Sequence, residues 1–495
     1  MLRILLPIAV MANLAISGEA RPAAIDGMSV KPETWRGAPG FWRVVQAADG
    51  RWWFIDPQGK RQFVRAVTSA NTTNRSGGRR APEGTYVKTV AERYGGDADA
   101  WAKAQAQRLA GWGFTAVGPW NHPTAWRGKG LAELDIVEFS YNAPNTRAHE
   151  LHMADPFDPA WAAQAEAWVL KLCAPRRDDP TLLGWFLDNE MGWGPSRTPE
   201  EDAADTVMAA KFAPGDLTLL QKALMLPDGV GLREEAWRFC EQRHGGLAGV
   251  AKAWGVPLAN RAAPRGWTKR GKRTTYAADG RRREEEADIP QRLSSRGFAD
   301  DADAFLEHVT ATYLERTLAL MRKHAPNHLV LGVRFGGEPP EPVKRAFAKH
   351  PVDVLSFNSY FGPKTFAKRL DWYAQWQQPL FLGEFAWAMG GRFSGLDDKK
   401  WTEGRYTPQQ VGEGVARAQT LLPAVLERYA AHPNLVGYAW YRFVDTGDAL
   451  HTAPVRYGLV NVRDEPQQAA IAVLPAVNAR LAGIHGGGAL TTSLP

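Results

Sequence analysis

The chain has 495 residues, of which 44% are apolar and 23% are charged, and its formal net charge is +7. This composition is that of a folded globular protein and excludes a chain that is disordered throughout. Much of the positive charge lies in residues 268–283, directly before Glu284, Glu285 and Glu286, which indicates a solvated loop rather than a nucleic-acid surface.

The first residues have the pattern of a secretory signal. Arg3 precedes an apolar stretch at 4–16, and small residues follow at 17–20. We interpret residues 1–20 as a signal peptide because the apolar stretch is short for a membrane span, and an uncleaved anchor is the alternative. No other segment approaches the length of a membrane span. We therefore expect a secreted or periplasmic protein with no membrane span in the mature chain.

Residues 21–60 are predicted to form a short β-rich segment. Apolar runs at 40–45 and 52–55 flank Asp49 and Gly50, which are typical turn residues. The pattern predicts a hairpin that either caps the bottom of a barrel or forms a small appendage.

The rest of the chain alternates between short apolar runs and amphipathic stretches, which predicts an α/β fold. The expected strands are 63–67, 114–117, 134–139, 182–187, 329–333, 354–357, 380–382 and 436–440, and the clearest helices are 97–111, 160–172, 301–324 and 408–431. Eight such units predict a (β/α)8 TIM barrel over residues 61–485, followed by a tail at 486–495. A doubly wound open sheet is the alternative, but no phosphate-binding glycine motif follows the first strand.

A long insertion follows the fourth predicted strand. Residues 262–295 within it are rich in charge, glycine and proline, and we expect them to form an excursion over the catalytic face. The only two cysteines, Cys173 and Cys240, are expected in the core, and the sequence leaves open whether they form a disulfide.

Two of the apolar runs lead into a carboxylate. The run at 182–187 is followed by Asp188, Asn189 and Glu190, and the run at 379–383 is followed by Glu384. In a parallel barrel the carboxyl ends of the strands share one face, and glycoside hydrolysis needs two carboxyl groups across the scissile bond. We predict Glu190 as the general acid/base and Glu384 as the nucleophile. Each Glu alone has the alternative of a structural ion pair.

Three further residues are predicted around this pair. Asn189 is placed to donate to a sugar 2-hydroxyl, and the hydroxyl of Tyr360 to hold Glu384 ionised and oriented. Trp440, at the end of the last strand, is a candidate floor for a pyranose ring. A buried structural role is the alternative for Tyr360 and for Trp440.

Two arginines and one loop complete the predicted site. Arg65 and Arg334 lie in strands, so each should meet a carboxylate or a hydroxylated ligand, or be a structural partner of Asp188 or Glu384. Trp120 and Asn121 follow the second strand at the correct end of the barrel for a sugar contact, with loop packing as the alternative.

The sequence gives little support for a metal or a cofactor. His324 and His328 have the spacing of a helical metal site, but Pro326 between them should break the helix. The Gly-x-Ser-x-Gly motif of serine hydrolases is also missing. We therefore predict neither a metal nor a cofactor.

The strings at 112–118, 179–190, 327–335 and 457–461 resemble those of beta-agarase-type glycoside hydrolases of clan A, relatives of the family-42 beta-galactosidases. The resemblance implies a TIM barrel, retention of anomeric configuration through a glycosyl-enzyme intermediate, and attack on β-galactosidic linkages in a poly- or oligosaccharide. The chain departs from the family pattern at 385–391, directly after the nucleophile. A clan A β-glucanase or mannanase, and a non-catalytic carbohydrate-binding barrel, are the alternatives.

Overall fold

The computed structural model describes residues 22–73, 85–142, 153–195, 217–262, 268–276, 282–360, 363–387, 393–397, 400, 403–445 and 455–492. The predicted signal peptide at 1–20 lies outside these residues. Among the helices that the structure describes, none combines the length and the apolar character that crossing a membrane requires.

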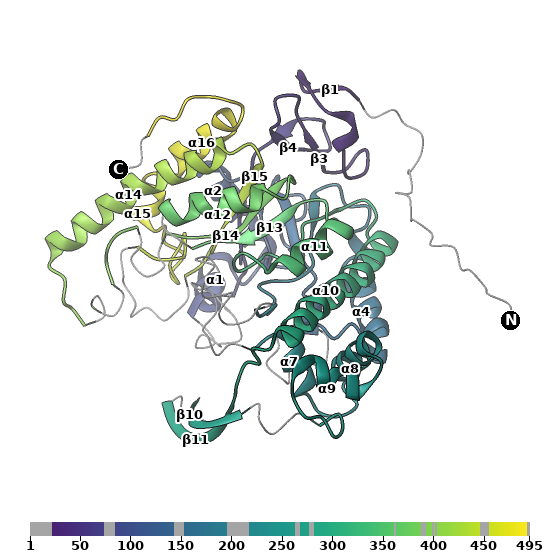
Figure 1. Cartoon of the computed structure of the whole chain (residues 1–495). Helices are drawn as coiled ribbons and strands as arrows, with labels where there is room; N and C mark the ends of the chain where they lie inside the picture. Colours follow the sequence, from purple (N-terminus) through teal and green to yellow (C-terminus); the bar gives the residue numbers. More distant parts are fainter. Residues whose placement is uncertain are drawn as a thin grey trace.

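Eight parallel strands form one curled sheet at the centre of the molecule (Figure 1). They are β6 (Val64–Val67), β7 (Ala116–Val117), β8 (Ala132–Ile136), β9 (Leu182–Phe186), β12 (Leu329–Val330), β13 (Leu355–Asn358), β14 (Leu380–Phe385) and β15 (Leu435–Trp440). Their spatial order is β12-β9-β8-β7-β6-β15-β14-β13. Neighbours in the sheet follow one another in chain order, except that β6 and β15, the first and the last of the eight, also pair with each other. All eight predicted strands are confirmed.

The two edge strands of this sheet, β12 and β13, are joined by backbone contacts. The backbone nitrogens of Asp353 and Val354 donate to the carbonyl of Val330 at 2.9 and 3.1 Å. Beyond the end of β12, Phe335 forms a parallel bridge with Phe357 of β13. The curled sheet is therefore consistent with the predicted (β/α)8 barrel.

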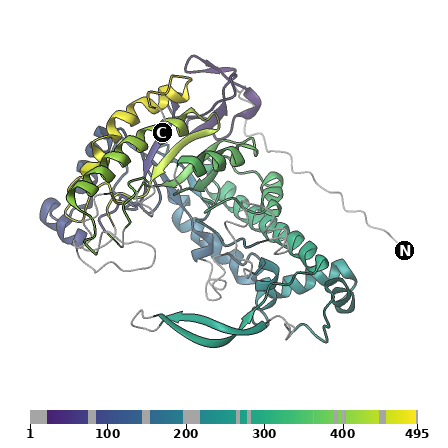
Figure 2. The ribbon, with the colours of Figure 1, turned by 60° about the vertical axis from the view of Figure 1, so that its left-hand side comes forward.

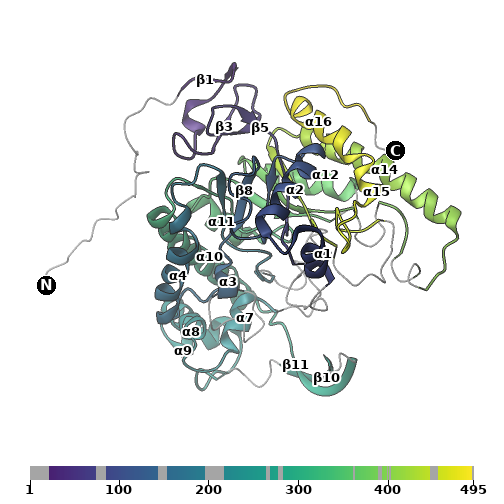
Figure 3. The same cartoon turned by 180° about the vertical axis from the view of Figure 1, so that it is seen from behind.

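Helices surround the sheet, and the four predicted ones are confirmed. The helices are α1 (Thr85–Tyr94), α2 (Ala98–Gly111), α3 (Phe139–Asn142), α4 (Pro159–Leu172), α7 (Leu219–Leu224), α8 (Gly231–His244), α9 (Leu247–Trp254), α10 (Arg296–His324), α11 (Glu341–Lys349), α12 (Pro363–Ala374), α14 (Pro408–Ala431), α15 (Gln468–Ile471) and α16 (Leu474–His485). The helix α10 begins before the predicted residue 301 because the side chain of Ser295 caps it, accepting from the backbone nitrogen of Phe298. Seen from behind, α7, α8 and α9 gather at one end of α10 (Figure 3).

The amino-terminal segment forms two small antiparallel sheets. The first pairs β1 (Ala24–Ile25) with β2 (Met28–Ser29), and the second joins β3 (Arg43–Gln46), β4 (Trp52–Ile55) and β5 (Arg61–Gln62). Trp42 and Phe54 pack against residues near the amino ends of the barrel strands, among them Leu183 and Phe381. Of the two predicted placements, the hairpin therefore takes the one that caps the bottom of the barrel.

The basic segment of the insertion is not a loop. Most of it belongs to β10 (Thr268–Tyr276), which pairs antiparallel with β11 (Arg282–Pro290) in a hairpin that projects from the rest of the ribbon (Figure 2). In this register Lys272 faces Glu286 and Arg273 faces Glu285. The register thus pairs positions of opposite charge, a sequence pattern that favours strand pairing.

Two further expectations concern the pair of cysteines and the predicted tail at 486–495. Cys173 and Cys240 are both buried and free, so they do not form a disulfide. Part of the predicted tail packs against the helix α14, where Thr491 and Thr492 donate backbone N–H groups to Glu427 at 2.8 and 3.1 Å. Burial opposes ionisation of Glu427, but hydrogen bonds from these threonines and from Arg480 outweigh it and lower its pKa to about 2.

Candidate active site

Glu384 and Glu190 lie at the carboxyl edge of the curled sheet. Glu384 is the next-to-last residue of β14 and is 5% exposed, whereas Glu190 follows the end of β9 and is exposed. This edge is opposite to the one that the amino-terminal hairpin caps. The two carboxyl groups therefore share the face on which barrel enzymes carry their catalytic residues.

Two donors hold the carboxylate of Glu384. Nη2 of Arg334 donates to its Oε1 at 2.6 Å, and the hydroxyl of Tyr360 donates to its Oε2. Burial raises the pKa of Glu384 above its ordinary value, Arg334 opposes this rise, and the charge of Glu190 adds to it. Burial and the neighbouring Glu384 also raise the pKa of Tyr360 well above its ordinary value, so its hydroxyl keeps its proton.

Asn358 connects the two carboxylates. Its Nδ2 donates to Oε1 of Glu190 at 2.9 Å and to Oδ1 of Asn189 at 3.0 Å. Nε of Arg334 donates to the same oxygen of Asn189 at 2.9 Å. An unbroken path of hydrogen bonds therefore runs from Glu190 through Asn358, Asn189 and Arg334 to Glu384. Sequence reasoning missed Asn358, although its position at the end of β13 was the available signal.

Arg334 is held between two aromatic rings. Its guanidinium lies 4.9 Å from the ring centroid of Trp120 and 4.9 Å from that of Phe186. Such cation–π contacts stabilise a cation that is removed from water. Nε1 of Trp120 in turn donates to Oε1 of Glu138 at 3.0 Å. Trp120 thus belongs to the site through Arg334, and Glu138 joins it through Trp120.

Two glycines leave room for these side chains. A Cβ at Gly336 would lie 3.2 Å from Cγ of Glu190, and a Cβ at Gly383 would lie 2.8 Å from Oδ1 of Asn358. Any larger residue at Gly383 would push Asn358 off the path that joins the carboxylates.

Five successive strands end near a non-glycine residue with positive φ. The residues are Ser69 (55°), Trp120 (63°), Glu138 (55°), Glu190 (50°) and Arg334 (50°), which follow β6, β7, β8, β9 and β12. This left-handed conformation is unfavourable for residues with a Cβ and is found most often where function requires it. All five of these strained residues therefore lie at the carboxyl edge of the sheet, on the same face as Glu190 and Glu384.

Two of the predicted site residues, Asn121 and Trp440, have structural contacts. Oδ1 of Asn121 accepts from the backbone nitrogen of Ala70 at 3.1 Å and so joins the loops after β6 and β7. The side chain of Trp440 is fully buried and donates to the carbonyl of Tyr457 at 2.7 Å, so it packs in the core and offers no face to a sugar.

Arg65 lies away from the carboxylates. Its Nε donates to the carbonyl of Gly113 at 2.7 Å, before β7 begins, which places the contact at the amino ends of the strands. Burial lowers the pKa of its guanidinium. Its partner is therefore a backbone carbonyl rather than Asp188, Glu384 or a ligand on the catalytic face.

Three partly buried tyrosines meet beside Glu384. The rings of Tyr360, Tyr441 and Tyr457 contact one another edge to face, with centroids 5.9 to 6.2 Å apart. Sequence reasoning named only Tyr360. Tyr441 directly follows the last strand, and this position was the signal that could have found it.

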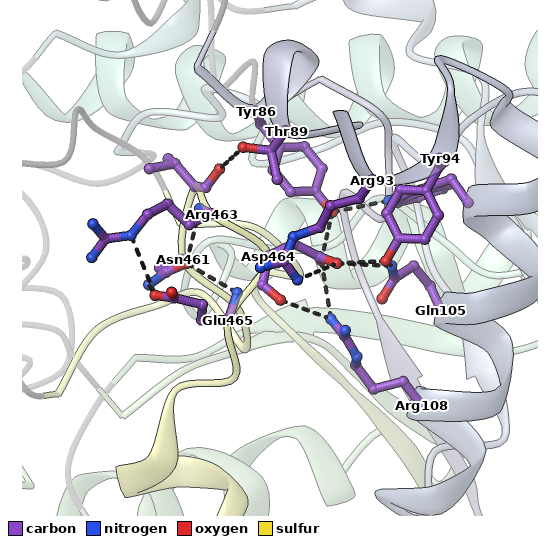
Figure 4. Close-up of polar contacts among 12 residues, drawn as sticks. Tyr86, Thr89, Arg93, Tyr94, Gln105, Arg108, Asn461, Arg463, Asp464 and Glu465 are labelled. Atoms are coloured by element: carbon purple, nitrogen blue, oxygen red, sulfur yellow. Dashed lines mark hydrogen bonds and ion pairs between the residues drawn. The ribbon is translucent and has the colours of Figure 1, made fainter. Parts of the chain in front are cut away.

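The loop that carries Tyr457 is anchored by a buried carboxylate, Asp464 (Figure 4). Its Oδ1 accepts from the hydroxyl of Tyr86 and from Nη1 of Arg108, both at 3.0 Å, and its Oδ2 accepts from the hydroxyl of Tyr94 at 2.6 Å. These donors come from α1 and α2, so the network fixes the loop after β15 to the first helices of the barrel.

Asp188 is a second buried carboxylate close to the site. It accepts from the backbone nitrogen of Ser140 at 3.1 Å and from the hydroxyl of Tyr313 at 2.7 Å, and no arginine in the described part of the chain donates to it. Burial raises its pKa to about 7 even though these donors oppose the rise. Asp188 thereby ties the loop after β8 to the loop that carries Glu190.

Within the described ranges, no group of three or more His, Cys, Asp or Glu side chains could hold a metal ion. His324 contacts Glu166 and His328 contacts the carbonyl of Asp179, so this pair has separate structural partners.

A curled sheet of eight parallel strands with two linked carboxyl groups at its carboxyl edge is the arrangement of TIM-barrel glycosidases. No family model matches the chain. Over 400 residues, 77% of its length, it is 26% identical to Beta-agarase B of Vibrio sp. (strain JT0107), and it spans only 36% of that relative.

Solved structures agree on the fold. The chain matches that of an exo-beta-agarase with a TM-score of 0.63 and 18% identity, over 91% of this chain and 66% of the other. It matches the agarase AgWH50C with a TM-score of 0.61 and 20% identity, again over 91% and 66%. The chain is therefore a beta-agarase-like protein with the fold of the solved agarases.

Proposed function

We propose that the chain is a secreted, retaining β-glycosidase that hydrolyses O-glycosidic bonds in a galactose-containing poly- or oligosaccharide. The observation that carries this proposal is the hydrogen-bonded path from Glu190 to Glu384 at the carboxyl edge of the sheet. The likeness to beta-agarases supports the choice of sugar.

The surroundings of the two carboxyl groups support different roles. Glu384 is buried and fixed by Arg334 and Tyr360, as a nucleophile that attacks the anomeric carbon must be. Glu190 is exposed and accepts from the amide of Asn358, which suits a group that protonates the leaving oxygen and later takes a proton from water. Glu384 and the sugar form a covalent intermediate between these two steps.

Other residues bind and orient the sugar in this proposal. Oδ1 of Asn189 is occupied by Arg334 and Asn358, so its Nδ2 is the group that donates to the sugar 2-hydroxyl. The rings of Trp120, Tyr441 and Tyr457 are partly exposed on the same face and provide surfaces on which a pyranose ring stacks.

The test is hydrolysis of agarose, other polysaccharides and p-nitrophenyl β-glycosides by the wild type and by Glu384→Gln and Glu190→Gln. We expect release from agarose or a β-galactoside by the wild type, a loss of about 10²–10⁴-fold for Glu190→Gln, and a loss at least as large for Glu384→Gln. Glu341→Gln, on the outer helix α11, is the matched control. NMR of the first product gives the anomeric configuration, and inversion would contradict the proposed mechanism.

Two other outcomes identify the alternatives. Activity restricted to glucans or mannans would keep the mechanism and change the substrate. Sugar binding without hydrolysis by the wild type would indicate a carbohydrate-binding barrel. Secretion is tested separately, by sequencing the amino terminus of the mature protein after expression of the full chain.

A further inference from the structure

Glu138 is a third carboxylate on the catalytic face, and the roles proposed above do not use it. It follows β8, is partly exposed, and accepts from Nε1 of Trp120 at 3.0 Å. Trp120 in turn covers the guanidinium that holds Glu384. Glu138 is therefore one indole ring and one guanidinium away from the nucleophile.

The backbone of Glu138 is in the same strained conformation as that of the residues that form the site. Its φ is 55°, against 63° for Trp120, 50° for Glu190 and 50° for Arg334. A carboxylate of this length has no intrinsic preference for the left-handed region. The loop after β8 therefore holds Glu138 in place at a conformational cost, as the loops after β7, β9 and β12 hold Trp120, Glu190 and Arg334.

The charge of Glu138 acts on the segment that carries Asp188 and Glu190. It adds a minor part to the rise in the pKa of Asp188, which burial mainly causes, and Asp188 lies two residues before Glu190 in the chain. Because Nε1 of Trp120 donates to Glu138, a sugar stacked on the indole would meet the carboxylate of Glu138 at its edge. Carboxylates accept hydrogen bonds from neutral hydroxyls and repel sulfate or carboxylate groups.

We propose that Glu138 and Trp120 form a binding position for an uncharged sugar unit, in which Trp120 stacks on the ring, Glu138 accepts from its hydroxyls, and the Glu138 charge rejects an anionic unit. This rests on the proposed function, and it adds the charge class of the substrate.

The experiment measures binding by the full chain carrying Glu384→Gln, so that no hydrolysis interferes. The probes are a neutral agaro-oligosaccharide and the same oligosaccharide after chemical sulfation. We expect the neutral probe to bind at least about tenfold more tightly, because a buried or partly buried charge repels a like charge strongly. Adding Glu138→Gln, which keeps an acceptor for Trp120, should reduce this ratio about tenfold. Glu341→Gln is again the control.

A second substitution at the same position and a salt series test the discrimination independently of Glu138→Gln. Glu138→Asn suits the positive φ, since asparagine tolerates this conformation, and should also lose the discrimination. With Glu138 present, the ratio should fall as salt rises, because ions screen the repulsion, and it should depend less on salt in both variants. A ratio that Glu138→Gln leaves unchanged overturns the inference alone. Failure to bind either probe overturns the proposed substrate and the inference together.

Discussion

The guanidinium of Arg334 donates to the carboxylate of Glu384 at 2.6 Å, and the arginine side chain is 0% exposed. Ion pairs removed from water are costly to break, because the partner that remains is a buried charge without compensation. The same guanidinium bonds Asn189 and lies against Trp120, so this one side chain ties together much of the candidate site.

Replacing Arg334 by Met should shift the pH dependence of activity. Arg334 lowers the pKa of Glu384, so its removal raises that pKa further and leaves the nucleophile protonated at higher pH. We expect the acid limb of the pH profile of kcat/KM to move to higher pH and the unfolding free energy to fall by about 3–5 kcal/mol. Arg345→Met, which breaks an ion pair on the surface, should leave the acid limb in place. An unmoved limb in Arg334→Met would contradict the assigned role.

Asp188→Asn should remove a pH dependence of stability. The pKa of Asp188 is raised from 3.8 to about 7, so between these values the folded state holds a proton that the unfolded state has lost. The stability of the wild type therefore falls as pH rises through this window, by up to about 4 kcal/mol, and the neutral asparagine does not share this loss. In urea unfolding from pH 4 to pH 8, the free energy of unfolding of the variant should rise relative to that of the wild type. A constant difference would mean that Asp188 is ionised throughout.

Glu427→Gln should change the pH dependence of stability in the opposite direction. Its pKa is lowered from 4.5 to about 2, so the carboxylate stabilises the fold fully above pH 4.5, and this contribution is lost as pH falls toward 2. We expect the variant to lose about 3 kcal/mol at neutral pH and the deficit to shrink below pH 4.5. Glu413→Gln on the same helix is the control. A deficit that stays constant down to pH 3 would rule out this linkage.

Asp464→Asn should destabilise the loop that carries Tyr457. The change weakens hydrogen bonds from Tyr86, Tyr94 and Arg108 to a buried charge, for an expected loss of about 3 kcal/mol in chemical unfolding. The neighbouring Glu465 is exposed, so Glu465→Gln should change stability by less than about 0.5 kcal/mol. Equal effects of the two changes would show that the Asp464 network does not anchor this loop.

The strands and the paired carboxylates could be predicted because both depend on local patterns. Apolar runs of strand length mark the sheet, and a Glu directly after such a run must lie at its carboxyl edge. The hairpin β10–β11 was missed because its strands carry charge instead of an apolar face, and only the register reveals the compensation.

Side-chain directions could not be predicted in the same way. Trp440 and Tyr441 are adjacent at the end of β15, and strand alternation sends one ring into the core and the other to the site. Arg65 and Arg334 are both predicted to lie in strands, but Arg65 lies in β6 and bonds at the amino ends of the strands, whereas Arg334 follows β12 at the carboxyl edge. Asn358 has no distinctive neighbours in the sequence, and its role emerges only from its contacts with Asn189 and Glu190.

The row of left-handed residues at the strand ends also bears on engineering. Glycine adopts this conformation without strain, so a selection for heat resistance alone would favour it at positions such as Ser69 and Glu138. Each such gain would delete a side chain from the catalytic face. Attempts to make the protein more robust should therefore leave these strand ends unchanged and look for improvements elsewhere in the barrel.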